Sequence, residues 1–201
     1  RGDEPERAVA LLQEALAGPA QARHPLLGTL ALVALGYAAL DRGDLEEAEG
    51  AVWRALALLS GIDLEPSAAL GAKVLHAQVL RRRGQLTEAL TELDAALGTA
   101  TAPALLFPRR QALAHRAGTL LELGRPREAL EAAREALAMG SEDAKSTVLA
   151  LRAYGSALRA CGEDDLAVRA LREALEVARA TGQRSEARQT ERVLAAAGPR
   201  R

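Results

Sequence analysis

The chain has 201 residues and a formal net charge of −1, and 26% of its residues are charged. This balance provides no overall attraction to nucleic acid or to acidic membranes, so either role would need a local basic patch. The single cysteine, Cys161, excludes an internal disulfide and fits a reducing compartment. We therefore expect a cytoplasmic protein without direct contact to nucleic acid or membrane.

The first predicted element is a helix over residues 5–17. Pro5 follows two acidic residues, which favours a first helical turn, and Val9, Leu12 and Leu16 form a helical stripe. The segment matches only the second half of the repeat described next. We therefore expect the chain to be a fragment of a longer protein, with an N-terminal edge that could self-associate.

One pattern recurs four times downstream: a small residue, then a glycine seven residues later, an alanine five after that, and an Ala-Leu pair seven further on. The glycines, Gly43, Gly84, Gly124 and Gly162, are 41, 40 and 38 residues apart. A glycine can end a helix in the left-handed conformation, and small residues let two helices approach closely. The pattern predicts helical hairpins over residues 25–59, 67–97, 109–138 and 143–180, followed by a polar capping helix over residues 183–197.

Two stretches between these elements need separate interpretation. The longest apolar run, 15 residues from Leu26 to Leu40, is short of the roughly 20 residues that span a bilayer, and it predicts a buried helix. The break from Gly98 to Pro108 is predicted to be a linker. We expect Leu105, Leu106 and Phe107 within it to fold down as a lid.

At the recurring small residues and glycines, the chain resembles the tetratricopeptide repeat (TPR) family. The resemblance implies a single all-α domain, residues 1–201, shaped as a right-handed superhelical solenoid of about four TPR-like hairpins with a leading half repeat and a capping helix. The period exceeds the family's usual ~34 residues. Longer units look like the TPR regions of large ATP-dependent LuxR-type bacterial regulators.

The resemblance also implies a concave binding face formed by the first helix of each hairpin. Carried over by position, the candidate residues are Val33, Tyr37, Leu40 and Asp41 in the first hairpin, Val74, Gln78, Arg81 and Arg82 in the second, Ala114, Gly118, Leu121 and Glu122 in the third, and Arg152, Ser156, Arg159 and Ala160 in the fourth. An apolar end followed by arginines would suit an acidic or C-terminal peptide segment, because arginine can hold a carboxylate bidentately. The alternative is that these arginines only solvate the wall.

No catalytic, cofactor or metal site is expected. His24, His76 and His115 have no cysteine or paired carboxylates at metal-ligand spacing, although His76 and His115 could approach one another. Cys161 is interpreted as a packed residue rather than a nucleophile. Trp53 is expected to be partly buried at the next repeat junction, with an exposed partner anchor as the alternative.

The sequence therefore predicts a non-enzymatic protein- or peptide-binding scaffold. The alternative is the effector-sensing and oligomerisation region of an ATP-dependent transcriptional regulator, where a small molecule would be the ligand. Arginine supplies nearly all of the positive charge and alanine is abundant, which suggests a bacterial source with a GC-rich genome.

Overall fold

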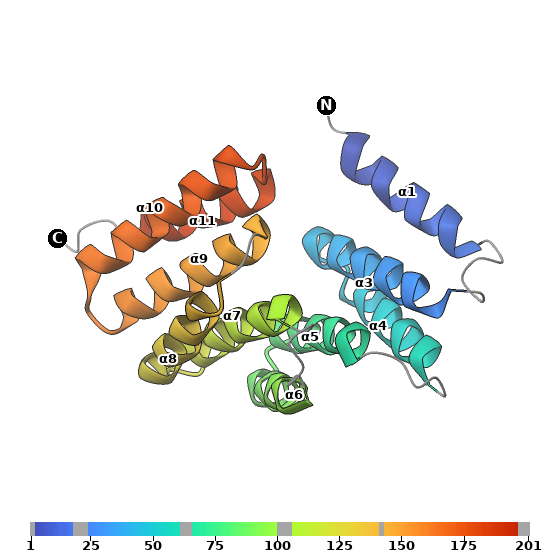
Figure 1. The fold of residues 1–201 in the computed structure, drawn as a ribbon, viewed down its shortest axis with the longest axis horizontal. Coiled ribbons are helices and arrows are strands. Elements are labelled where there is room, and N and C mark those ends of the chain that lie inside the picture. Colours follow the sequence, from blue (N-terminus) through green and yellow to red (C-terminus); the bar gives the residue numbers. More distant parts are fainter. Residues whose placement is uncertain (1–2, 18–23, 61–65, 100–105, 141–142, 197–201) are drawn as a thin grey trace. The chain divides into compact units, whose positions relative to one another are not determined.

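In the computed structural model, the chain is described over residues 3–17, 24–60, 66–99, 106–140 and 143–196, and all of its regular structure there is α-helical (Figure 1). The helices of these ranges are α1 (Asp3–Ala17), α3 (Pro25–Arg42), α4 (Leu45–Leu59), α5 (Pro66–Arg82), α6 (Leu86–Thr99), α7 (Leu106–Glu122), α8 (Pro126–Ala138), α9 (Ala144–Ala160), α10 (Asp164–Ala180) and α11 (Arg184–Ala196). The expected all-α hairpin repeats are confirmed.

The four turn glycines all adopt the left-handed conformation, with φ of 83°, 80°, 72° and 88° in chain order. At Gly43, the backbone N–H groups of Gly43 and Asp44 donate to the carbonyls of Leu40 and Ala39, at 3.1 and 2.9 Å. These bonds satisfy carbonyl groups that the end of α3 leaves unpaired. A side chain at this φ would strain the backbone, so the recurrent glycine is what ends each first helix.

Small residues are required where helices cross. A Cβ added to Gly155 of α9 would lie 2.7 Å from Leu171 Cγ of α10, the second helix of the same hairpin. A Cβ added to Gly36 of α3 would lie 2.3 Å from Leu75 Cδ2 of α5, in the next hairpin. Both contacts are closer than real Cβ atoms allow, so the glycines set the spacing between the helices.

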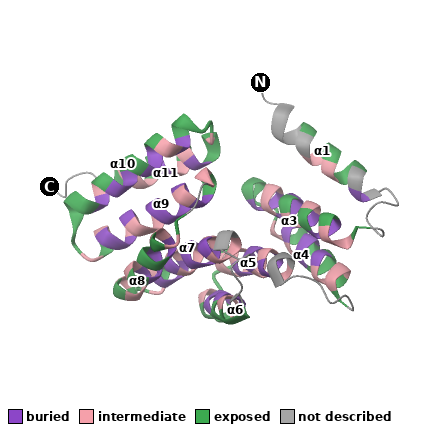
Figure 2. Ribbon diagram, in the orientation of Figure 1, coloured by how far each residue is buried: buried purple, intermediate pink, exposed green. Residues whose placement is uncertain are grey.

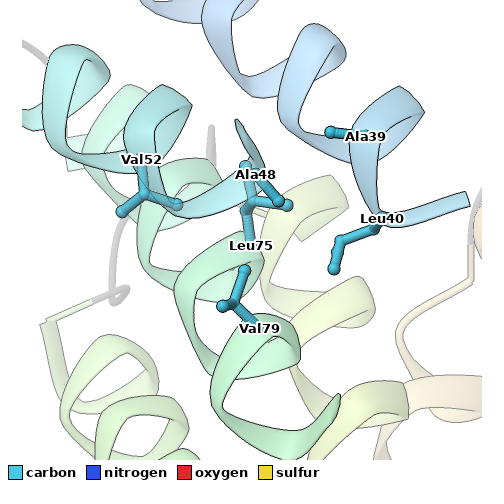
Figure 3. Close-up of a cluster of buried hydrophobic side chains, with 6 residues drawn as sticks. All are labelled: Ala39, Leu40, Ala48, Val52, Leu75 and Val79. Carbon is cyan, nitrogen blue, oxygen red and sulfur yellow. The ribbon is translucent and has the colours of Figure 1, made fainter. Parts of the chain in front are cut away.

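Most described helices bury one face and expose the other, and Figure 2 shows the two kinds of residue alternating along the ribbons. One core cluster joins α3, α4 and α5. Its fully or almost fully buried members are Ala39, Leu40, Ala48, Val52, Leu75 and Val79 (Figure 3). Burial of such apolar side chains, at about 25 cal/mol per Å², is the main stabilising contribution to a hairpin stack.

The chain divides into two compact units, Arg1–Glu92 and Leu93–Arg201, with the boundary inside α6. In the first unit α3 packs against α1, α4 and α5, and in the second α9 packs against α7, α8, α10 and α11. A single continuous solenoid domain stays a prediction.

The linker predicted from Gly98 to Pro108 is wrong at both ends. Gly98 lies inside α6, and the backbone of Leu106 and Phe107 belongs to the first turn of α7. The side chains that were expected to form a lid lie outside the described part of the chain. Leu105 lies outside the described residues. Proline is tolerated in the first helical turn, where its missing N–H would have no helical partner, so Pro108 does not delay the start of α7.

Helix α3 contains the longest apolar run. Among the described helices it alone is long and apolar enough, by length and composition, to cross a membrane, with a mean hydropathy of 1.2 over 18 residues. Its buried residues, among them Leu32, Leu35 and Leu40, pack in clusters with side chains of neighbouring helices. This is the environment expected of a core helix.

Candidate binding surfaces

The first helices of the first unit are linked by a polar contact. The side chain of Gln78 on α5 donates a hydrogen bond from Nε2 to Tyr37 Oη on α3, at 3.2 Å. Both side chains are half-buried, and Tyr37 also packs against the core cluster of α3, α4 and α5. Burial raises the pKa of Tyr37, and the bond from Gln78 partly offsets this rise, so the phenol stays protonated near neutral pH. Two of the predicted residues are thus brought together.

The apolar part of the predicted face is smaller than the sequence suggested. Leu40 is 4% exposed and Val74 is 1% exposed, so both side chains belong to the core beneath the surface. Val33 is half-buried and Asp41 is exposed. Of the four candidates on α3, three therefore remain accessible to a ligand.

Three consecutive arginines lie at the end of α5 and in the turn that follows it. Arg81 is half-buried and Arg82 is exposed. The next residue, Arg83, was not predicted as a candidate, and it donates to Glu49 of α4 at 3.0 Å. Cations near a helix C-terminus interact favourably with the helix dipole. Arg83 therefore links the turn after α5 to α4, whereas the side chain of Arg82 is exposed to solvent.

In the second unit, the candidates lie on α7 and α9, which pack against each other. Arg152 Nη1 donates to Glu186 Oε2 of α11 at 2.6 Å, and their side chains are 15% and 12% exposed. Arg152, one of the predicted candidates, is therefore already paired with a carboxylate of the chain. Ser156 and Arg159 are half-buried, and Glu122 and Ala160 are exposed.

Arg110 is a buried cation that sequence reasoning missed. It is 3% exposed, and its guanidinium donates to the carbonyl of Ala136 on α8 at 2.9 Å and to Thr147 Oγ1 on α9 at 3.1 Å. Burial lowers the pKa of Arg110, and Asp143 partly opposes that change. The residue connects three helices rather than facing a ligand. Nothing in the repeat pattern distinguishes it from neighbouring arginines.

Trp53 is more exposed than expected, at 53%, although it does lie at the junction with the next hairpin. Its ring centroid is 5.1 Å from that of His76 on α5. His76 Nδ1 lies 3.7 Å from a carboxylate oxygen of Glu92 on α6.

Cys161 is half-buried with a free thiol. In the described part of the chain, no three His, Cys, Asp or Glu side chains gather as a metal site would require.

A pocket of about 420 Å³ opens in the first unit between α1, α3 and α4. Its apolar lining is almost fully buried and consists of Leu16, Leu32, Leu35 and Ala51. Its remaining lining residues, Gln13, Glu47, Gly50 and Arg54, are exposed. This pocket was not predicted, and the one signal for it in the sequence is Gly50, a glycine in the middle of a helix.

Comparison of the sequence with protein-family models finds no match, and comparison with curated proteins likewise finds none. Solved structures do match. BtubC (BKLC) from P. vanneervenii superposes with a TM-score of 0.66 at 18% identity, over 98% of this chain and 96% of that chain.

Two further matches have lower scores. One is a Podosopora anserina putative kinesin light chain with nearly identical TPR-like repeats, with a TM-score of 0.54 at 19% identity over 90% of this chain and 89% of that one. The other is MamA, with a TM-score of 0.53 at 16% identity over 91% and 98%. At these identities the likeness establishes the fold alone. The chain therefore has the TPR-like helical-repeat fold that its glycine and alanine spacing predicts.

Proposed function

We propose that this chain is a non-enzymatic scaffold that binds a protein or peptide segment on the first-helix face of its hairpins. A TPR-like repeat suits protein interaction, because first helices of neighbouring hairpins pack side by side, α3 with α5 in the first unit and α7 with α9 in the second. The observation that carries the proposal is the hydrogen-bonded pair of Tyr37 and Gln78 on adjacent first helices. Tyrosine is enriched among the residues that dominate binding energy at interfaces.

The charges around this pair favour an acidic segment as the ligand. Arg82 is exposed one turn beyond Gln78 on α5, where a carboxylate could reach it. A guanidinium can hold a carboxylate through two parallel hydrogen bonds. In the second unit, Ser156 and Arg159 are the corresponding candidates, since Arg152 is already paired. Binding through either unit is part of the proposal.

Selection from a displayed peptide library, followed by measured affinities, tests this proposal. We expect the selected peptides to be acidic and to bind at least tenfold more weakly, about 1.4 kcal/mol, when Gln78→Ala and Arg82→Glu are combined. The matched control is Arg134→Glu, an exposed arginine on the second helix α8, which should leave affinity within twofold. Equal affinity of the double variant and wild type would reject the first-helix face.

The effector-sensing alternative remains a hypothesis about a longer protein. It would require a small molecule to bind this region and change its association state. Analytical ultracentrifugation with and without a bound ligand would distinguish it from a scaffold whose association state is constant.

A further inference from the structure

Gly50 is the residue of the pocket that the fold itself does not explain. It lies in the middle of α4, away from any turn, and a Cβ built on it would meet nothing within 4 Å. Gly36 and Gly155, by contrast, are required by helix crossings. A glycine inside a helix destabilises it by about 1 kcal/mol relative to alanine. Neither backbone conformation nor helix packing accounts for that cost at Gly50.

The other hairpins show what normally occupies this position. Seven residues after their turn glycines they carry Thr91, Glu131 and Arg169, all of them exposed. Only the first hairpin has no side chain there, and Gly50 is one of the residues that line the pocket. The missing side chain therefore leaves the mouth of the pocket open between α1 and α4.

The charges at the mouth decide which kind of ligand fits. Glu47 is ion-paired with Arg42, so its carboxylate is already neutralised. Arg54 is exposed and has no ion-pair partner among the residues that the structure describes, and Gln13 is uncharged. The mouth thus offers one unpaired positive charge above a buried floor of three leucines and an alanine. A volume of about 420 Å³ is at the lower end for small-molecule sites.

We propose that the pocket between α1, α3 and α4 binds a small amphiphilic carboxylate. Its apolar chain contacts Leu16, Leu32 and Leu35, and its carboxylate lies at the mouth, where Arg54 can donate to it. The backbone of α4 at Gly50 lets the ligand pass without a steric clash. This site is separate from the first-helix face, because the lining residues that α3 contributes, Leu32 and Leu35, are buried, and the exposed lining residues lie on α1 and α4.

The test is titration of the whole chain with octanoate, decanoate and 4-phenylbutyrate, followed by calorimetry and by amide NMR shifts. We expect saturable binding at one site for at least one of these acids, with shifts concentrated on α1, α3 and α4. The uncharged analogue 1-octanol should bind at least tenfold more weakly than octanoate. Absence of saturable binding by all three acids would overturn the proposal.

Two variants and their matched controls separate pocket binding from adsorption to the surface. Gly50→Leu fills the mouth and should weaken binding at least tenfold, whereas Thr91→Leu, at the equivalent position of the second hairpin, should change it less than twofold. Arg54→Gln should weaken binding at least fivefold, and Arg134→Gln should not. Circular dichroism checks that each variant is folded. If folded Gly50→Leu bound the acids as wild type does, the site assignment would be wrong.

A negative result for the pocket can be distinguished from a negative result for peptide binding on the first-helix face. Gly50→Leu should leave affinity for library-selected peptides unchanged, because those are expected on α3 and α5. Loss of peptide binding in that variant would contradict the separation of the two sites.

Discussion

Replacement of Arg110 by methionine tests the packing of the second unit most sharply. Methionine retains an apolar stem but removes the guanidinium, which donates to Ala136 O at 2.9 Å and to Thr147 Oγ1 at 3.1 Å. Ala136 lies in the last turn of α8, where carbonyl groups have no helical partner. Thr147 lies in the first turn of α9 and itself donates to the carbonyl of Asp143 at 3.0 Å. One side chain thus connects the end of α8 to the start of α9.

The expected loss of stability follows from the groups left unpaired. Hydrogen bonds from a charged donor contribute roughly 1.5–3 kcal/mol each, and a buried acceptor left unsatisfied costs roughly 1–3 kcal/mol. Burial of the guanidinium opposes these contributions, as the lowered pKa of Arg110 indicates, and methionine removes that penalty. We therefore expect Arg110→Met to lower the free energy of unfolding by about 2 kcal/mol. Arg110→Ala adds a cavity and should cost about 1–2 kcal/mol more.

Urea unfolding followed by circular dichroism measures this loss. The matched control is Arg116→Met, also on α7, where the ion pair with Asp94 at 2.6 Å has side chains that are 26% and 49% exposed. An exposed pair contributes at most about 1 kcal/mol. If Arg110→Met were no more destabilising than Arg116→Met, the connecting role of Arg110 would be refuted.

Three further predictions follow from burial and contact geometry. Gly155→Ala should lower stability by about 1–3 kcal/mol, because its Cβ would lie 2.7 Å from a leucine side chain, whereas Gly50→Ala, with open space around it, should raise stability by about 1 kcal/mol. Thermal unfolding compares the two, and shifts of the same sign would contradict the packing. Glu186→Gln removes the charge that pairs with Arg152 and should lower the free energy of local opening of α11 by roughly 1–3 kcal/mol. The expected observation is faster amide exchange, confined to α11 and the facing part of α9. Uniform exchange across the unit would argue against a local cap contact. Leu27 and Leu30 are 62% and 52% exposed on α3, so we expect concentration-dependent association in light scattering that a double change to glutamate removes. If the wild-type chain stayed monomeric at all concentrations, self-association through Leu27 and Leu30 would be rejected.

The turns and hairpins were predictable because their determinants are local. A left-handed residue is needed wherever a first helix ends abruptly, and glycine supplies it at Gly43 and its three equivalents. The start of α7 was missed because Pro108 looked like the end of a linker. Proline is compatible with either reading, and only the backbone placement distinguishes them.

Which candidate side chains are free to contact a ligand could not be predicted, because this depends on contacts between helices that are distant in sequence. The sequence gives no sign that Arg152 is paired, because its partner Glu186 lies 34 residues away on α11. Leu40 was assigned to the surface by its distance from Gly43, yet it is buried under α5. The pocket depends on three helices together. Such features follow from how helices cross, and the repeat pattern constrains that crossing only at its small residues.

Four equivalent turns divide the chain into helical hairpins. NMR backbone assignment of the whole chain tests it most directly. We predict helical chemical shifts over all ten described helices, interrupted by positive φ at Gly43, Gly84, Gly124 and Gly162. Extended-strand shifts in these segments, or an uninterrupted helix through any of the four glycines, would contradict it.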